Sequence, residues 1–235
     1  MEKKKKWGMK VMENLNLQLL IFDMDGLILD TERIALKSWE IMLKEYEYQF
    51  DKEFLISLFG TTEDSMEARF KNHYGQDFPF EQFRQRCMQE RLKMIEQEGE
   101  TLIKYGLTDL LNFAKTNKIQ TAVATSTVRS IAEKSLKLSG LLNSFDTIVC
   151  GDEIKNSKPQ PDIFLKAAEK ANVSPENAIV LEDSSNGIKA ASNANMRCIW
   201  IKDIVIPSEE VLSLTWAKPQ NLKEVILLLS PFITK

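Results

Sequence analysis

The chain has 235 residues, 43% of them apolar and 28% charged, and its formal net charge is −3. This composition is typical of a soluble globular protein long enough to bury a core without disulfides, in one large domain or two smaller ones. It offers no broad basic surface for a nucleic acid, and its three widely spaced cysteines have neither metal-ligand spacing nor the flanks of a nucleophile, so we expect reduced, buried thiols.

The N-terminal segment, residues 1–16, begins with a run of lysines at positions 3–6. No apolar stretch follows them, as a signal peptide would require. We predict a disordered extension, with a weak tether to an anionic surface as the alternative. No apolar run approaches the length of a bilayer span, so we expect no membrane partner and a cytoplasmic location. We also expect a monomer or a weak homo-oligomer.

Short apolar runs along the chain are typical of buried parallel strands. They cover Leu17–Phe22, Ile119–Thr125, Asp146–Cys150, Ala178–Leu181 and Arg197–Ile201. Segments with helical periodicity lie between the later runs, at Thr108–Lys118, Arg129–Ser139, Pro161–Asn172 and Asn186–Asn195. This alternation predicts an α/β fold with a doubly wound, Rossmann-like parallel sheet.

The first strand is followed by a long segment, residues 31–103, with only helical periodicity. The longest helix in it should run from Phe80 to about Gln97. We therefore predict a small all-helical domain, inserted after the first strand, that covers the carboxyl edge of the sheet. The core would comprise residues 17–30 and 104–235, with hinges near 27–31 and 99–106.

Ligands of open α/β sheets bind beyond the carboxyl ends of the strands. The first strand ends in Asp23-Met24-Asp25-Gly26. Two acids so close raise each other's proton affinity unless a cation or hydrogen bonds compensate. At this spacing both side chains leave the strand on one side, so that one carboxylate can attack while the other transfers protons. A plain Asp-Gly turn is the alternative.

Two further strand ends carry weaker signals. Thr125, Ser126 and Thr127 could bind a phosphate with their hydroxyls and the backbone N–H groups of a helix start, although N-capping alone would explain them better. Lys158 stands in Ser157-Lys-Pro-Gln-Pro-Asp162, where the prolines stiffen the backbone beside its ammonium. Taken alone, a surface lysine in a capping turn is the better interpretation.

The fourth strand end places Glu182 and Asp183 after Ile179-Val-Leu181. Carboxylate oxygens suit Mg²⁺, whereas N-capping of the next helix is the alternative for Asp183. With Asp23 and Asp25 the site would hold four negative charges against the one positive charge of Lys158. A phosphate dianion would then be repelled by several kcal/mol per close pair at intermediate dielectric, on the order of magnitude expected from Coulomb's law, unless a divalent cation bridged it.

The joint order and spacing of these motifs resembles that of the haloacid dehalogenase superfamily, over essentially the whole chain from Leu17 onward. Asp23-Met-Asp-Gly is similar to the first family motif, Thr125 to the second, Lys158-Pro159 to the third and Glu182-Asp183 to the fourth. The helical insertion resembles a C1-type cap, and Phe22–Glu32 resembles the branch of beta-phosphoglucomutase and small sugar-phosphate phosphatases.

The resemblance implies a role for each matched residue. Asp23 would attack phosphorus to form an aspartyl-phosphate, and Asp25 would act as acid and then base. Thr125, with Ser126, and Lys158 would bind the phosphoryl group. Mg²⁺ would be held by Asp23, the Asp25 carbonyl and Asp183, with Glu182 as a ligand or one step removed. The substrate would be a small phosphorylated metabolite.

Departures from the family pattern favour a phosphatase over a phosphosugar mutase. Ala35 stands where the mutase has a histidine, and Glu63 stands where it has a cap arginine that holds the far phosphate. Asp25 argues against a dehalogenase, which lacks the second aspartate. A phosphonate hydrolase would need a cap lysine, for which Lys37 and Lys44 are candidates only by type. A phospho-accepting signalling module is the alternative from another class, although it would have no cap.

Overall fold

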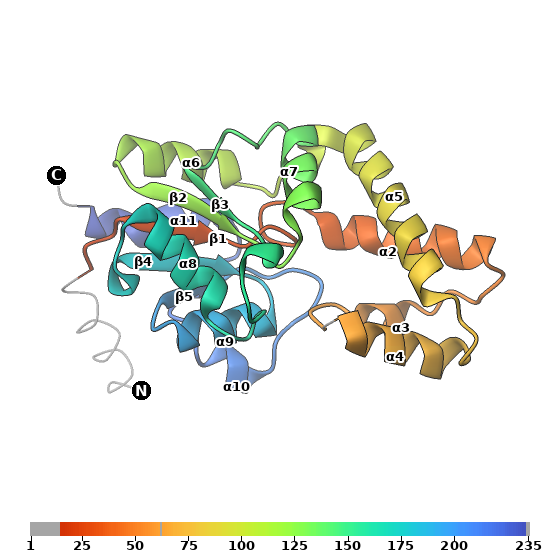
Figure 1. Ribbon diagram of the computed structural model, residues 1–235. Helices are drawn as coiled ribbons and strands as arrows, with labels where there is room; N and C mark the ends of the chain where they lie inside the picture. The colour runs from red at the N-terminus through yellow and green to blue at the C-terminus, as the bar shows by residue number, and fades with distance from the viewer. Residues whose placement is uncertain (1–14, 62, 234–235) are drawn as a thin grey trace.

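The computed structural model describes residues 15–61 and 63–233 (Figure 1). The predicted disordered extension, residues 1–16, lies outside this range except for its last two residues. Of these, Leu15 is buried in the main hydrophobic core, so the packed part of the chain begins slightly before the predicted start at Leu17. In the part of the chain that the structure describes, no helix is long and apolar enough to cross a membrane.

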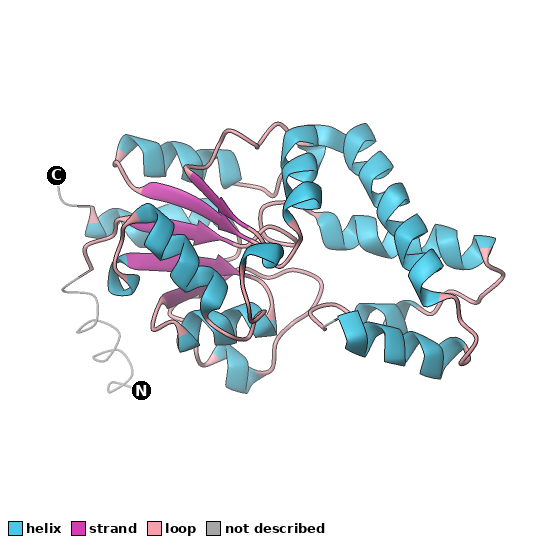
Figure 2. Cartoon of the chain, viewed as in Figure 1, coloured by secondary structure: helices cyan, strands magenta, loops and turns pink. Residues whose placement is uncertain are grey.

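Five parallel strands form one sheet in the order β3-β2-β1-β4-β5 (Figure 2). Their bounds are β1 Leu19–Phe22, β2 Gln120–Ala124, β3 Thr147–Val149, β4 Ala178–Glu182 and β5 Arg197–Trp200. Each lies within or one residue beyond a predicted apolar run, and the predicted fold class is confirmed. Phe22 in the central strand pairs with Val123 on one side and Leu181 on the other, so the three strands end at the same level.

Helices cover both faces of the sheet because strand side chains alternate between two apolar cores. Leu20 and Phe22 join one core, and Leu19 and Ile21 join the other. The first core is closed by α6 (Leu107–Thr116), α7 (Arg129–Leu138) and α11 (Leu222–Leu229). The second is closed by α8 (Asp162–Ala171), α9 (Ser185–Asn193) and α10 (Glu209–Leu212), as Figure 1 shows.

The segment between β1 and β2 forms the helical cap, made of α2 (Thr31–Glu45), α3 (Lys52–Ile56), α4 (Glu63–Tyr74) and α5 (Phe80–Glu98). The cap has a hydrophobic core of its own, rich in aromatic side chains that contact Phe70. Ile34, Met94 and Ile95, at the core-facing ends of α2 and α5, instead join the core beneath the sheet. The cap therefore has a core of its own and is anchored to the sheet domain by the start of α2 and the end of α5, its two longest helices.

Two chain segments connect the cap to the sheet, and they lie side by side. Leu29 pairs with Ile103 in an antiparallel bridge. The N–H of Asp30 donates to the Leu102 carbonyl at 2.9 Å, and the N–H of Lys104 donates to the Ile28 carbonyl at 3.0 Å. The domain boundaries after residues 30 and 103 stay predictions, but these backbone bonds make the two connections one paired element.

Short 3₁₀ turns complete the chain at η1 (Gly99–Leu102), η2 (Gly151–Glu153), η3 (Pro175–Asn177) and η4 (Ser230–Phe232). The predicted helices of the core differ from the observed ones by at most two residues at either end.

The three cysteines are free and buried, in line with the expectation of reduced, buried thiols. The C-terminal helices α10 and α11 were not among the predicted elements.

The Phe70 ring stands at the centre of the cap core, fully buried, with ring contacts to Trp39, Phe54, Phe78 and Phe83. We expect Phe70→Ala to lower the free energy of unfolding by about 3–5 kcal/mol, because truncation leaves a cavity among rigid rings. Urea denaturation followed by tryptophan fluorescence measures it. Leu227→Ala, at a side chain 75% exposed, should change stability by less than about 0.5 kcal/mol, and equal losses in both variants would contradict the packing described here.

Candidate active site

The carboxyl ends of β1, β2 and β4 face the cap across a cavity of about 520 Å³. Pockets for small molecules usually measure roughly 300–1,000 Å³, so its size suits a small metabolite. Among the residues on its wall are Asp23, Asp25, Thr125, Ser126, Lys158 and Asp183. The structure therefore brings these six candidates to one cavity, while Glu182 is not among its lining residues. Their chemical roles stay predictions.

Asp23 lies directly beyond β1 and is only 8% exposed. The Lys158 ammonium donates a hydrogen bond to its Oδ1. Burial, assisted by the neighbouring carboxylates of Glu182 and Asp25, raises the pKa of Asp23 to about 7 although Lys158 lowers it. Lys158 thus offsets part of the cost of burying this carboxylate, and a second cation would be needed to offset the rest.

Lys158 is buried, and all three donors of its ammonium are taken by protein groups. They go to Asp23 Oδ1, the Ala124 carbonyl at 3.1 Å and Glu182 Oε1 at 2.8 Å. Burial alone would lower the pKa of this ammonium, but the two carboxylates raise it above its ordinary value. Lys158 therefore remains charged and fixes the orientation of Asp23 from beside the β2 end.

Glu182 is fully buried at the end of β4, and both of its oxygens have donors. Oε1 accepts from Lys158, and Oε2 accepts from the N–H of Asp183, the N–H of Ser184 and the Ser184 hydroxyl, at 2.8, 2.8 and 3.0 Å. The sequence prediction made Glu182 either a metal ligand or a group one step removed from the metal, and this role stays a prediction. In the structure its carboxylate completes a buried hydrogen-bond network that holds Lys158.

Asp25 is partly exposed, and hydroxyl groups from both the cap and the core hold its carboxylate. Thr31, in the first turn of α2, donates to Oδ1 at 2.7 Å, and Thr127 donates to Oδ2 at 2.8 Å. Thr125 lies 3.5 Å from Oδ2 and accepts the N–H of Thr127. The candidate acid/base is therefore positioned by the hinge end of the cap and by the β2 end at once.

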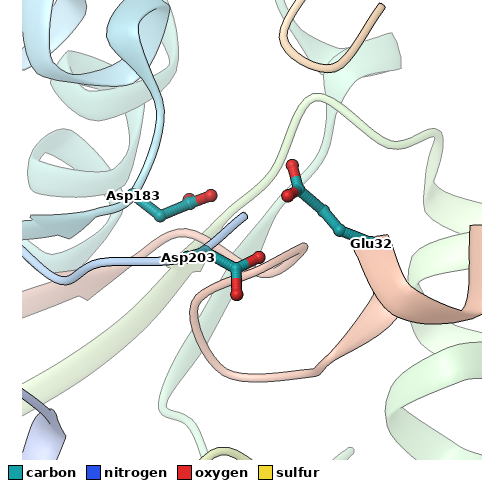
Figure 3. Close-up of side chains that lie close together, drawn as sticks. All are labelled: Glu32, Asp183 and Asp203. Atoms are coloured by element: carbon teal, nitrogen blue, oxygen red, sulfur yellow. The ribbon is translucent and has the colours of Figure 1, made fainter. Parts of the chain in front are cut away.

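Three carboxylates from distant parts of the chain lie close together, as Figure 3 shows. Glu32 projects from the start of α2, Asp183 from the β4 end and Asp203 from the loop after β5, and one oxygen of each lies within 4.8 Å of the others. The Lys104 ammonium contacts Asp203 Oδ1 at 2.5 Å. Carboxylate oxygens at this spacing are the donor set that a hard divalent cation prefers.

Buried oxygen atoms of this group lack protein donors. Asp183 Oδ1, Glu32 Oε2 and Asp203 Oδ2 have no hydrogen-bond partner among the described residues. Burial, followed by the neighbouring carboxylates, raises the pKa of Asp183 well above its usual range and that of Glu32 to about 8. Unsatisfied oxygens and excess negative charge fit the divalent metal that the sequence led us to expect, because a cation would satisfy both.

Several residues of the site were missed from the sequence. Glu32 and Asp203 stand singly in a helix start and a loop, and Thr31 and Arg91 lie in cap helices whose orientation toward the core is a tertiary property. Trp200, the last residue of β5, donates its indole N–H to the Asp183 carbonyl at 2.8 Å. Of these contacts, the hydrogen bond from Thr31 to Asp25 joins residues only six positions apart. It is the one contact that a local sequence pattern could have indicated.

The structure describes most of the positions at which this chain departs from the mutase and phosphonate hydrolase patterns. Ala35 lines the cavity, where it offers a methyl group in place of a histidine. Thr62 and the side chain of Glu63 lie outside the described residues. Lys37 and Lys44 are exposed on α2 and are not among the lining residues of the cavity, which removes support for imine chemistry in the described part of the chain.

Comparison with known proteins assigns the family. The family model described as haloacid dehalogenase-like hydrolase matches residues 20–201, which span both the sheet and the cap. The chain therefore belongs to the haloacid dehalogenase-like hydrolases.

Similarity to curated relatives indicates the class of hydrolase within this family. A phosphorylated carbohydrates phosphatase of Thermotoga maritima is 31% identical over 186 residues, covering 78% of this chain and 84% of the relative. The fructose-1-phosphate phosphatase YqaB of Escherichia coli is 33% identical over 184 residues, covering 78% and 95%. The crystal structure of CbbY from Rhodobacter sphaeroides in complex with phosphate superposes with a TM-score of 0.75 at 28% identity, covering 89% and 96%. The predicted superfamily and enzyme class, a phosphoric monoester hydrolase, are confirmed.

Gly187, in the first turn of α9, approaches Glu182 so closely that a Cβ there would lie 1.6 Å from Oε1. We expect Gly187→Ala to displace the Glu182 carboxylate and hence Lys158 and Asp23. A shift of about 1 Å at reacting groups can cost about 100-fold in rate, so kcat/KM for p-nitrophenyl phosphate should fall by that order. Lys189→Ala, exposed on the same helix, is the matched control. Full activity in Gly187→Ala would show that this network does not position Asp23.

Proposed function

We propose that the protein is a Mg²⁺-dependent phosphatase that hydrolyses a small phosphorylated sugar or similar metabolite through an aspartyl-phosphate on Asp23. The observation that carries the proposal is the Asp23–Lys158 ion pair at the cavity floor, with the hydroxyl-bound carboxylate of Asp25 two residues away. One carboxylate is oriented for attack, and the other is held where it can exchange a proton with a bound ester.

In the first half-reaction, Asp23 attacks phosphorus and the ester oxygen leaves. Lys158 donates to Oδ1, so we assign the attack to Oδ2. The bond from Oδ2 to phosphorus forms as the bond from phosphorus to the leaving oxygen breaks, and protonated Asp25 gives that oxygen its proton. Thr125, at the β2 end, and the N–H groups that follow it support the phosphoryl oxygens.

In the second half-reaction, Asp25 is a carboxylate and takes a proton from water. The resulting hydroxide attacks phosphorus, releases inorganic phosphate and restores Asp23. Thr31 and Thr127 can each donate to the ionised form of Asp25, at 2.7 and 2.8 Å, which supports its role as a base in this step.

Asp23, Asp183 and the backbone carbonyl of Asp25 are the groups that we propose hold the metal. Glu32 and Asp203 supply further oxygens beside Asp183. Mg²⁺, when bound, would offset the negative charge of these groups and stabilise the charge on the transferring phosphoryl group. We assign Glu182 to the Lys158 network rather than to the metal, because both of its oxygens already accept hydrogen bonds.

A sugar phosphate is the substrate class best supported by the relatives, whose names specify phosphorylated carbohydrates and fructose 1-phosphate. The phosphosugar mutase alternative has less support, because the apolar Ala35 lines the cavity where the mutase has a histidine. Phosphate release from a panel of phosphomonoesters, with and without Mg²⁺, separates the two. The panel should include beta-glucose 1-phosphate with a trace of its bisphosphate, since isomerisation without net phosphate release would establish a mutase.

Asp23→Asn should lower kcat by about 10⁴-fold or more, because an amide oxygen cannot form the phosphoenzyme. Phosphate release under saturating substrate measures the loss. Mass spectrometry of the acid-quenched wild type should detect one added phosphoryl group, absent in the variant. An exposed carboxylate of the core provides the control, Asp152→Asn. Normal turnover by Asp23→Asn would end the covalent mechanism.

Asp183→Ala should weaken Mg²⁺ binding by at least about tenfold, since even groups that only orient metal ligands contribute that much. Isothermal titration with MgCl₂ in the absence of substrate measures affinity independently of turnover. Asp146→Ala, at the carboxylate that accepts from Thr121 away from the cavity, is the control. An unchanged Mg²⁺ affinity in Asp183→Ala would remove this residue from the metal site.

A further inference from the structure

Two arginines of the cap helix α5, Arg84 and Arg91, line the cavity together with Cys87 and Met88. Their spacing places them on one face of the helix, two turns apart. This face borders the same cavity as the strand-end carboxylates Asp23, Asp25 and Asp183. The cavity therefore has an acidic floor on the core side and a cationic wall on the cap side.

Arg91 is the better defined of the two. Its guanidinium forms an ion pair with Asp25 among the described residues. The distance to Asp25 Oδ1 is 3.8 Å, which is beyond hydrogen-bond distance. Its Nε is buried without a hydrogen-bond partner. Asp25 already accepts hydrogen bonds from Thr31 and Thr127, so the guanidinium retains donors that this contact does not use.

Lys158, which also lines the cavity, has no free donor for an additional anion, because its three donors bond Asp23, Ala124 and Glu182. A ligand whose phosphoryl group lies at Asp23 projects its leaving part away from the sheet, toward α5. An anionic group on that part would be repelled by the floor, where Asp23 and Asp183 lie, and attracted by the guanidinium of Arg91, whose planar fork matches an oxyanion.

We propose that Arg91 is a specificity-determining residue that binds an oxyanion, either a carboxylate or a second phosphate, on the leaving part of the substrate. The inference rests on the proposed phosphatase function and deepens it by naming the substrate class: a phosphomonoester with a second acidic group, rather than a neutral sugar phosphate. Arg84, two turns earlier on the same face, extends the cationic wall.

The opposing explanation is that Arg91 acts only through Asp25. In that case its removal slows every substrate equally, whatever the leaving part carries. Matched pairs of substrates separate the two explanations. Glucose 6-phosphate and 6-phosphogluconate differ by a carboxylate, and fructose 1-phosphate and fructose 1,6-bisphosphate differ by a second phosphate. The two pairs also distinguish the two sources of the oxyanion.

The experiment measures kcat and KM for both pairs with wild type, Arg91→Gln, Arg91→Lys and Arg86→Gln. Arg86 is the control, since it belongs to the same helix but is exposed and pairs with Glu45 at 2.7 Å. For at least one pair, the wild type should prefer the acidic member. Arg91→Gln should lose about 10- to 100-fold in kcat/KM for that member alone, mainly through KM, because hydrogen bonds to charged groups contribute on that scale.

Arg91→Lys should retain part of the preference, since it keeps the charge and loses the fork. Equal losses for both members of each pair, or no loss in Arg91→Gln, would overturn the inference. Wild-type hydrolysis of only the neutral members would also overturn it and leave the phosphatase function intact. Absence of phosphate release from every compound, p-nitrophenyl phosphate included, would instead overturn the proposed function itself.

Discussion

The buried Lys158 ammonium, bonded to Asp23 and Glu182, is the interaction on which the rest of the site depends. Removing one partner from such a group leaves an uncompensated charge in a region of low dielectric, which is strongly destabilising. The lysine also bonds the Ala124 carbonyl, so it ties together the ends of β1, β2 and β4. The geometry of Asp23 is consequently set by the sheet itself, and a flexible loop has little part in it.

The position of Asp25 is set differently from that of Asp23, because the residues that bond its carboxylate come from both the cap and the core. Thr127 belongs to the sheet and Thr31 to the cap, and each bonds one carboxylate oxygen. The paired connections around Leu29 and Ile103 keep the start of α2 close to the β1 end. A movement of the cap would therefore change the surroundings of Asp25 without disturbing those of Asp23, so the two carboxylates can differ in solvation.

The fold could be predicted because buried strands are short apolar runs and the helices between them keep their period. The acids at the strand ends stood out because charge after a buried strand is costly. Glu182 and Asp183 show where this reasoning stops: adjacent residues point to opposite sides of a strand, so only one could face the cavity, and the sequence did not say which. Asp203 and Arg91 could not be found, since their roles arise from the placement of a loop and a helix in space.

The arrangement separates chemistry from selectivity. The core supplies carboxylates, a lysine and hydroxyls at fixed strand ends, and its matched motifs constrain the reaction. The cap supplies Arg91, Ala35 and the stacked pair of Trp39 and Phe59, whose ring centroids lie 5.2 Å apart, all on the cavity wall. An acidic floor opposite a cationic and aromatic wall orients a ligand by its charges. Substitutions of a few cap residues would therefore alter the ligand that this cavity accepts and leave the strand-end residues unchanged.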